Sequence, residues 1–80
     1  MRVTVRCFAQ LRELATDRTE LDLTDGATLE DAWRRLEELH AGIGPHRPYV
    51  RGARNGVYAA WDQQLADGDT VAFLPPVSGG

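Results

Sequence analysis

The residues with the most distinctive chemistry stand at the end of the chain, Pro75-Pro76-Val77-Ser78-Gly79-Gly80. The two prolines remove two backbone N–H donors, so we expect the sheet to stop there and the tail to leave it in an extended form. Gly79 and Gly80 have no Cβ, which lets the chain end enter a channel too narrow for an ordinary side chain. The sequence therefore predicts a folded domain over residues 1–75 and a flexible, reactive tail over residues 76–80, which reaches roughly 17 Å when extended. The alternative interpretation is a frayed chain end without a function.

Other side chains that could do chemistry are few. Cys7 is predicted to be a small core hydrophobe rather than a sulfur relay. His40 and His46, with one thiol at these spacings, do not form a zinc site, so no metal is expected. Asp67 and Asp69 are interpreted as turn formers. Because no Ser–His–Asp or paired-carboxylate arrangement stands out, we expect a reactive chain end without catalytic machinery of its own.

Composition narrows the function classes further. The chain has 80 residues, 42% hydrophobic and 26% charged, which is typical of one globular domain. A net charge of −3 gives no electrostatic footprint for nucleic acid. No apolar run approaches the ~20 residues that span a bilayer, and no signal-peptide segment is present, so we expect a cytoplasmic protein without a membrane partner. All nine basic residues are arginine, which fits codon bias or a chain whose side chains cannot carry isopeptide bonds.

The first half of the chain predicts two strands and two helices. Residues 3–8 alternate as a half-buried strand, residues 9–15 have helical spacing, and residues 19–23 predict a second strand. Thr28 and Asp31 form a capping box before a helix over residues 29–40. Its apolar stripe contains Leu29, Ala32, Trp33, Leu36 and Leu39.

The second half of the chain predicts only strands. Residues 42–48 form a connection rich in glycine and proline, which excludes a central strand. Strands over residues 50–54 and 57–61 flank Asn55-Gly56, a strong hairpin signal, and the last strand covers residues 70–75. The first and last strands are the most apolar and are expected to be central neighbours. The prediction is an α+β roll in which Trp33, Leu36 and Leu39 pack on one mixed sheet, against Val3, Val5, Leu21, Val71 and Phe73.

Strand alternation also predicts a surface patch. Phe8 and Leu74 fall on the faces opposite Val5 and Phe73, so neighbouring first and last strands bring them together on the outer face of the sheet. Tyr58 is expected to join them. Scattered apolar residues are normal on a surface, but a cluster beside the base of a reactive tail is typical of a partner site. Phe8, Leu74 and Tyr58 are therefore predicted to form a docking patch.

Two segments carry a family resemblance: residues 5–14, VRCFAQLREL, and residues 65–80, LADGDTVAFLPPVSGG. The order of elements before a Gly-Gly end resembles ubiquitin-like proteins. The two segments are similar to the small, sulfur-carrier subunit of molybdopterin synthase, a ubiquitin-like protein of the MoaD/ThiS type, and the resemblance is weakest over residues 40–54. It implies a ubiquitin-like β-grasp roll: a mixed sheet packed on one long helix, with an extended C-terminal Gly-Gly tail.

The resemblance also implies a reaction. A partner adenylates Gly80, and a persulfide donor converts this glycyl adenylate to a thiocarboxylate, 1-thioglycine. The tail, which comprises Pro76, Val77, Ser78 and Gly79 before that residue, inserts into the large synthase subunit. There the sulfur attacks cyclic pyranopterin monophosphate, and two carriers in turn install the molybdopterin dithiolene. Binding would hold the sulfur beside the reacting carbon.

The implied partners are the large synthase subunit, in a heterotetramer of two small and two large subunits, an adenylyltransferase related to ubiquitin-activating enzymes, and a sulfur donor. ATP and magnesium belong to the adenylyltransferase, and this chain is expected to bind no cofactor. Three alternatives stay open at this point. The chain carries sulfur for another pathway, such as thiazole formation, tRNA thiolation or cysteine synthesis; it is a ubiquitin-like modifier joined to lysines of other proteins; or it is an interaction module with an inert tail.

Overall fold

The structure is a computed structural model that describes residues 1–76. Its elements follow the order expected from the sequence, with a 3₁₀ helix (η1) between the second helix and the last three strands. They are β1 (Arg2–Cys7), α1 (Gln10–Leu14), β2 (Arg18–Asp22), α2 (Leu29–Leu39), η1 (Ala41–Tyr49), β3 (Arg51–Arg54), β4 (Val57–Ala59) and β5 (Thr70–Leu74).

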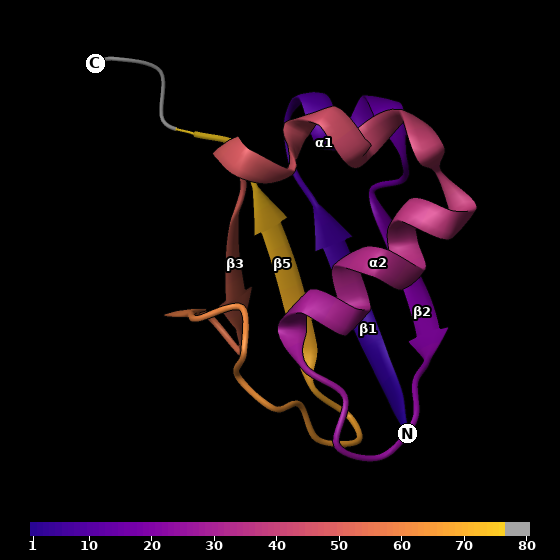
Figure 1. The fold of residues 1–80 in the computed structure, drawn as a ribbon, viewed down its shortest axis with the longest axis vertical. Coiled ribbons are helices and arrows are strands. Elements are labelled where there is room, and N and C mark those ends of the chain that lie inside the picture. The colour runs from indigo at the N-terminus through magenta and orange to yellow at the C-terminus, as the bar shows by residue number, and fades with distance from the viewer. Residues whose placement is uncertain (77–80) are drawn as a thin grey trace.

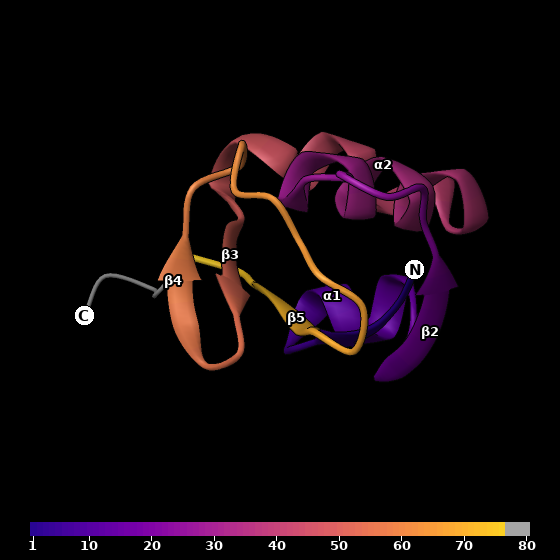
Figure 2. The same ribbon diagram turned by 90° about the horizontal axis from the view of Figure 1, so that it is seen from below.

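The five strands form one mixed sheet in the order β2-β1-β5-β3-β4. β1 and β5 are parallel central neighbours, as predicted, and the other pairs are antiparallel. α2 crosses one face of the sheet, which we call the inner face, and no helix of residues 1–76 covers the other face, the outer face (Figures 1 and 2). α1 and η1 lie at the end of the sheet where β1 and β5 finish (Figure 1).

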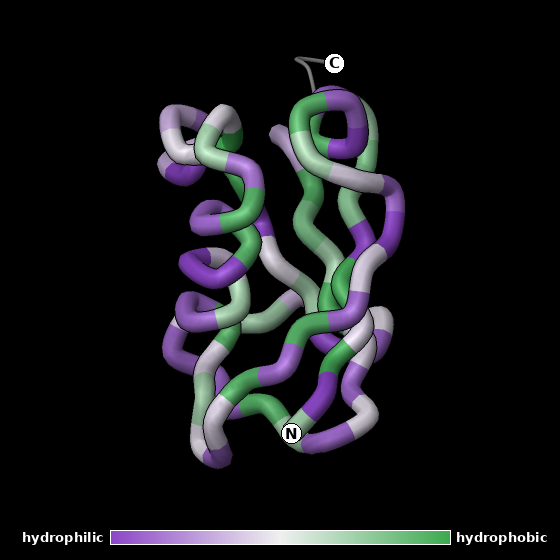
Figure 3. Tube along the Cα trace, turned by 90° about the vertical axis from the view of Figure 1, so that its right-hand side faces the viewer, coloured by the Kyte–Doolittle hydropathy of each residue, from purple (hydrophilic) through white to green (hydrophobic). Residues whose placement is uncertain are grey.

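The core lies between α2 and the inner face. Along β1 and β5 every second residue is buried, because successive strand side chains point to opposite faces. Hydrophobic and hydrophilic residues alternate along much of the chain in Figure 3. Three aromatic rings fill the centre: Trp33 meets Phe73 edge-on at 5.1 Å, and Trp61 stacks on Phe73 at 5.8 Å. The Trp33 indole N–H donates to Glu37, so the large buried ring leaves no polar group unsatisfied.

The start of α2 confirms the predicted capping box. The Thr28 hydroxyl accepts from the Asp31 amide at 3.3 Å, and the Asp31 carboxylate accepts from the Thr28 amide at 2.9 Å. The other end of the helix contradicts one prediction: Leu39 was expected to pack on the sheet but is 50% exposed. Leu39 occupies the last helical position, at one edge of the apolar stripe and beyond Leu36, the last buried residue of the helix.

Three further differences from the predicted elements concern the structure of residues 42–48 and the residues at which β4 and β1 end. The connection predicted over residues 42–48 is the 3₁₀ helix η1, which buries Ile43 against the core. β4 ends at Ala59, so Trp61 lies beyond the strand and reaches back over the inner face. β1 ends at Cys7, which puts Phe8 immediately after the strand rather than inside it.

Candidate functional site on the outer face and at the base of the tail

The outer face carries the apolar cluster that alternation predicts. β3 and β5 are paired so that Arg51 lies opposite Leu74, and Ala53 is paired with both Ala72 and, across β4, Tyr58. A hollow of about 300 Å³ opens there, lined by Phe8, Ala53, Gly56, Tyr58, Ala72 and Leu74. We call Phe8, Tyr58 and Leu74 the outer patch. Phe8 is 37% exposed and Tyr58 63% exposed, so both rings are available to a partner.

Local backbone geometry sets the positions of the two rings. Ala9, directly after Phe8, has φ 52°, a costly value for a residue with a Cβ, and this bend turns the chain from β1 into α1. Asn55 and Gly56 have φ 49° and 85°, the left-handed pair that a tight hairpin requires. The hairpin returns Tyr58 to the outer face beside Ala53.

A buried carboxylate holds this hairpin against β5. Asp69 is 6% exposed and accepts from the Arg54 guanidinium at 2.7 Å, the Asn55 side-chain amide at 3.0 Å and the Ala66 backbone amide at 2.7 Å. Burial alone would raise the pKa of Asp69, but these three donors outweigh it and leave the pKa below its ordinary value. Asn55 adds a reciprocal pair of bonds with the backbone of Thr70.

The sequence interpretation of Asp69 as a turn former was therefore incomplete. The turn exists, since Gly68 has φ 86°, but the Asp69 carboxylate also links the start of β5 to the β3–β4 hairpin. Asp67 has the simpler role: it is exposed and accepts from the Arg2 backbone amide at 2.7 Å. No local pattern separates the two aspartates, because Arg54 reaches Asp69 from a distant strand.

The base of the tail adjoins the outer patch. β5 ends at Leu74, and a second hollow of about 320 Å³ is lined there by Tyr49, Arg51, Tyr58, Leu74, Pro75 and Pro76. Pro76 is exposed. The other predicted tail residues, Val77, Ser78, Gly79 and Gly80, lie outside the described residues, so their roles stay predictions.

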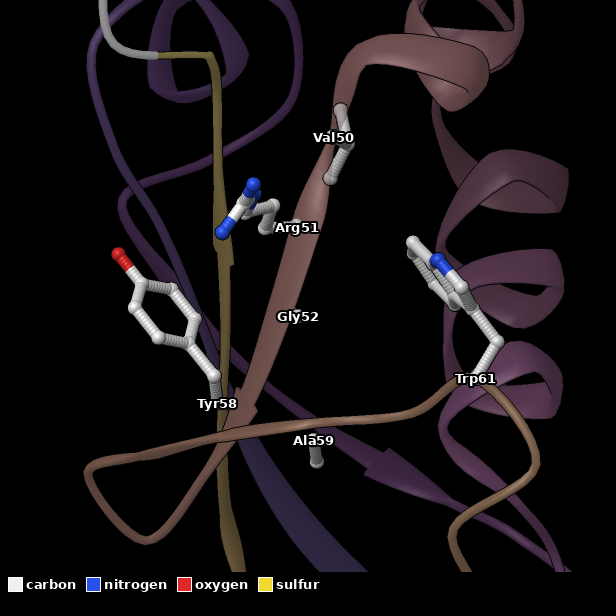
Figure 4. A pocket seen from close by; sticks show the side chains of 6 residues that line it. All are labelled: Val50, Arg51, Gly52, Tyr58, Ala59 and Trp61. Atoms are coloured by element: carbon white, nitrogen blue, oxygen red, sulfur yellow. The ribbon is translucent and has the colours of Figure 1, made fainter.

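A third hollow lies where the β3–β4 hairpin faces the core. It measures about 240 Å³ and is lined by Val50, Arg51, Gly52, Tyr58, Ala59 and Trp61. Figure 4 shows Arg51 and Tyr58 on one side of β3 and Trp61 on the other, and Val50 is buried in the core. A Cβ on Gly52 would overlap the Leu29 side chain, so this glycine lets α2 approach β3 closely.

The one thiol belongs to the core and not to the outer face. Cys7 is 1% exposed, and burial, with a smaller contribution from Asp17, raises its pKa to about 11. A buried, protonated thiol is a poor nucleophile, which agrees with its interpretation as a core residue. Within residues 1–76, no group of three or more histidine, cysteine, aspartate or glutamate side chains is placed to hold a metal ion. Over the same residues no helix is long and apolar enough to cross a membrane.

Comparison with known proteins first identifies the fold class of this molecule. Small archaeal modifier protein 1 of Haloferax volcanii is 36% identical over 84 residues, covering 94% of this chain and 97% of that protein. Its crystal structure matches with a TM-score of 0.89 at 30% identity, covering 100% of both chains. The fold is thus the ubiquitin-like β-grasp, and the expectation of that fold is confirmed.

Two further relatives are a sulfur carrier subunit and a chain from a two-subunit complex. The molybdopterin synthase sulfur carrier subunit of Escherichia coli is 36% identical over 81 residues, covering 98% of this chain and 99% of that protein. A complex of subunits 1 and 2 of the molybdopterin-converting factor from Helicobacter pylori contains a chain that matches with a TM-score of 0.74 at 27% identity, with 100% of both chains covered. The ThiS family matches residues 5–80, and the chain belongs to this family of sulfur carriers.

Proposed function

We propose that the chain carries sulfur as a thiocarboxylate on Gly80 and delivers it to cyclic pyranopterin monophosphate, forming the molybdopterin dithiolene. One observation of the described residues supports this proposal most: the central strand β5 ends at Leu74, beside the outer patch, and the tail starts there without a spacer. A partner that covers the patch therefore receives the tail at a fixed starting point.

The chemistry assigns different tasks to this chain and to its partners. A carboxylate at neutral pH is a poor electrophile, so the terminal carboxyl needs activation before it accepts sulfur. We propose that an adenylyltransferase supplies this activation with ATP and magnesium, and that a persulfide donor then attacks the glycyl adenylate and displaces AMP. A thiol reductant cleaves the resulting acyl disulfide, which releases the thiocarboxylate and leaves the donor and the thiol joined as a disulfide. This chain contributes the carboxyl group of Gly80, a narrow tail and the docking surface. The proposal assumes that all of these proteins meet in the cytoplasm.

We further propose that the adenylyltransferase and the large synthase subunit dock on the same patch, Phe8, Tyr58 and Leu74. The relative from Helicobacter pylori is in a complex with a second subunit, which supports a partner subunit for this chain. A shared patch makes the two complexes mutually exclusive, so the carrier must leave the first partner before it reaches the second. Two small and two large subunits are the proposed stoichiometry of the synthase.

A ubiquitin-like modifier is the second candidate, because a relative at 36% identity is named a modifier protein. In that function Gly80 would be joined to lysines of other proteins. The chain itself has nine arginines and no lysine, so its own side chains could not serve as acceptors and lysine-linked chains of it could not form.

Intact mass measured after purification from the native host tests both candidates. A gain equal to the difference between sulfur and oxygen at the C-terminus supports the carrier, whereas isopeptide-linked adducts support the modifier. An unchanged mass under every growth condition, without adducts, would leave an inert interaction module.

Changes in the length and the width of the tail provide further tests of the carrier function. Deleting Gly80, or adding one residue after it, should abolish adenylation while thermal unfolding stays unchanged, since the domain ends before these residues. Gly79→Val should still fold but insert poorly into a partner, because the added side chain widens the tail and restricts φ. Full activity of the extended chain without processing would contradict the carrier function.

A further inference from the structure

Two arginines flank the outer patch, and a third lies on the same face of the sheet. The Arg6 guanidinium carbon lies 5.5 Å from the ring centre of Phe8, and that of Arg51 lies 5.7 Å from the ring centre of Tyr58. Arg18 is paired with Arg6 across the β1–β2 ladder and therefore belongs to the same face. We call Arg6, Arg18 and Arg51 the arginine rim.

Weak charge pairing is a property of the rim but not of the rim alone, since Arg12 and Arg34 also have no carboxylate of residues 1–76 within 4.0 Å; what distinguishes the rim is its position on the outer face. Four arginines elsewhere lie within 2.7 to 3.1 Å of a carboxylate oxygen: Arg2, Arg35, Arg47 and Arg54. Arg6 lies 3.8 Å from Asp17, and its Nε has no hydrogen-bond partner within residues 1–76. For Arg18 and Arg51, no carboxylate of those residues lies within 4.0 Å.

The rim therefore places positive charge on one face of a chain whose net charge is −3, and the carboxylates of Glu20 and Asp22 on that face are paired with Arg2 rather than with the rim. Arg51 has the most useful position, because it lines the hollow at the base of the tail together with Leu74, Pro75 and Pro76. An arginine beside an aromatic ring is partly oriented before it meets a partner, so less conformational freedom is lost when a carboxylate binds it.

We propose that the arginine rim selects protein partners whose docking surface surrounds an apolar centre with carboxylates. The inference rests on the docking role proposed above and adds the chemistry of the partner. Charges at the edge of an interface act mainly on the association rate and on the choice between partners, whereas the buried apolar contacts hold the complex together. The rim would thus sort the partners of this carrier from proteins with basic or neutral docking surfaces.

Charge reversal tests the proposal, with Arg51→Glu on the rim and Arg34→Glu as the matched control. Arg34 is exposed on α2, which covers the opposite face of the sheet, and both changes alter the net charge equally (Figure 2). The measurement is the association rate with the adenylyltransferase of the same genome as ionic strength rises from about 0.01 M to about 1 M. Arg51→Glu should slow association about 10-fold or more at low salt and flatten its salt dependence. Arg34→Glu should change it less than about 2-fold.

Equal effects of Arg51→Glu and Arg34→Glu would overturn the selective role of the rim. A third variant, Leu74→Arg, separates this failure from failure of the docking role: normal binding by Leu74→Arg removes the outer patch from the interface altogether. Replacing a partner carboxylate with arginine should restore association of Arg51→Glu, and it identifies the carboxylate that Arg51 meets. Binding of a single-stranded oligonucleotide that Arg51→Glu abolishes, without any effect on the protein partner, would instead assign the rim to nucleic acid.

Discussion

The two faces of the sheet use the same residue types for different purposes. Phe73 points inward and is fully buried between Trp33 and Trp61, whereas its neighbour Leu74 points outward and lines the hollow of the outer patch. Strand alternation alone produces this division, since successive side chains of β5 point to opposite faces. Changes on the inner face should therefore act on stability, and changes on the outer face on partner binding.

Arg47 and Arg51 show a similar contrast. Arg47 lies against the core, where it donates two bonds to Glu30, at 2.9 and 3.1 Å, and covers the Trp61 ring at 3.4 Å. The hydrogen bond from Arg47 is the main reason that the pKa of Glu30 lies below its ordinary value. Arg51, four residues later, meets a ring but no carboxylate of residues 1–76. The charge of Arg47 is thus used within the fold, whereas that of Arg51 remains available to a partner.

Phe73→Ala should have the largest effect on stability. The ring is fully buried between two tryptophans, and its removal leaves a cavity that costs about 3–5 kcal/mol of the free energy of unfolding. Leu74→Ala is the matched control on the next residue and should cost about 1 kcal/mol or less. Urea titration monitored by tryptophan fluorescence measures both. Similar losses for the two variants would contradict the division between the faces.

Asp69→Ala should follow, with a loss of about 3 kcal/mol in the free energy of unfolding. The change leaves the Arg54 guanidinium and the Ala66 amide without their acceptor in a buried site. Asp67→Ala, which removes an exposed carboxylate in the same turn, should cost about 1 kcal/mol or less. A loss for Asp69→Ala no larger than that for Asp67→Ala would show that the buried carboxylate does not hold the hairpin.

The decrease in the free energy of unfolding at acid pH should depend on Asp69. Its pKa in the folded chain is lowered, so its contribution is fully present above the unfolded value of about 3.9 and is lost as pH falls through the folded value. Asp69→Asn should therefore flatten the decline in the free energy of unfolding below about pH 4. Denaturant titrations between neutral pH and acid measure this slope, and an unchanged slope would contradict the assignment.

Phe8→Arg and Leu74→Arg should weaken partner binding by about 2 kcal/mol or more, as expected for central interface residues. Both complexes should be affected, because the two partners are proposed to share the patch. Stability should change little, since Phe8 is 37% exposed and Leu74 lines an open hollow. Binding titrations against each partner provide the measurement, with Leu39→Arg on α2 as the control. An effect on one complex alone would separate the two docking surfaces.

Most of the fold follows from signals that are local in the sequence. Alternation predicts which residues of β1 and β5 are buried, Thr28 and Asp31 predict the start of α2, and Asn55-Gly56 predicts the hairpin. Each of these depends on residues a few positions apart. The proximity of Phe8 and Leu74 was also predictable, because it needs only alternation and the pairing of the two most apolar strands, whereas the place of Tyr58 depends on how the β3–β4 hairpin pairs with β5.

The features that the sequence did not predict depend on contacts between distant segments. The bonds from Arg54 and Asn55 to Asp69 form only after the hairpin packs beside β5, and no spacing in the sequence indicates them. The stacking of Arg47 on Trp61 likewise joins η1 to the segment after β4. Periodicity predicts which side of a helix is apolar, but it does not show where the sheet stops covering that side.

Leu39→Ala is expected to have the smallest effect on the free energy of unfolding, and it tests whether coverage by the sheet decides the contribution of each residue. It belongs to the helix that covers the inner face, yet it is 50% exposed, whereas Leu36, three residues earlier, is fully buried. Leu39→Ala should change the free energy of unfolding by about 1 kcal/mol or less, and Leu36→Ala should cost about 2–5 kcal/mol. Both leucines belong to one apolar stripe, so equal losses in parallel denaturant titrations would show that the stripe, not coverage by the sheet, decides the contribution. A large difference would show that burial against the sheet determines the energy of each position, as the contrast between Phe73 and Leu74 implies.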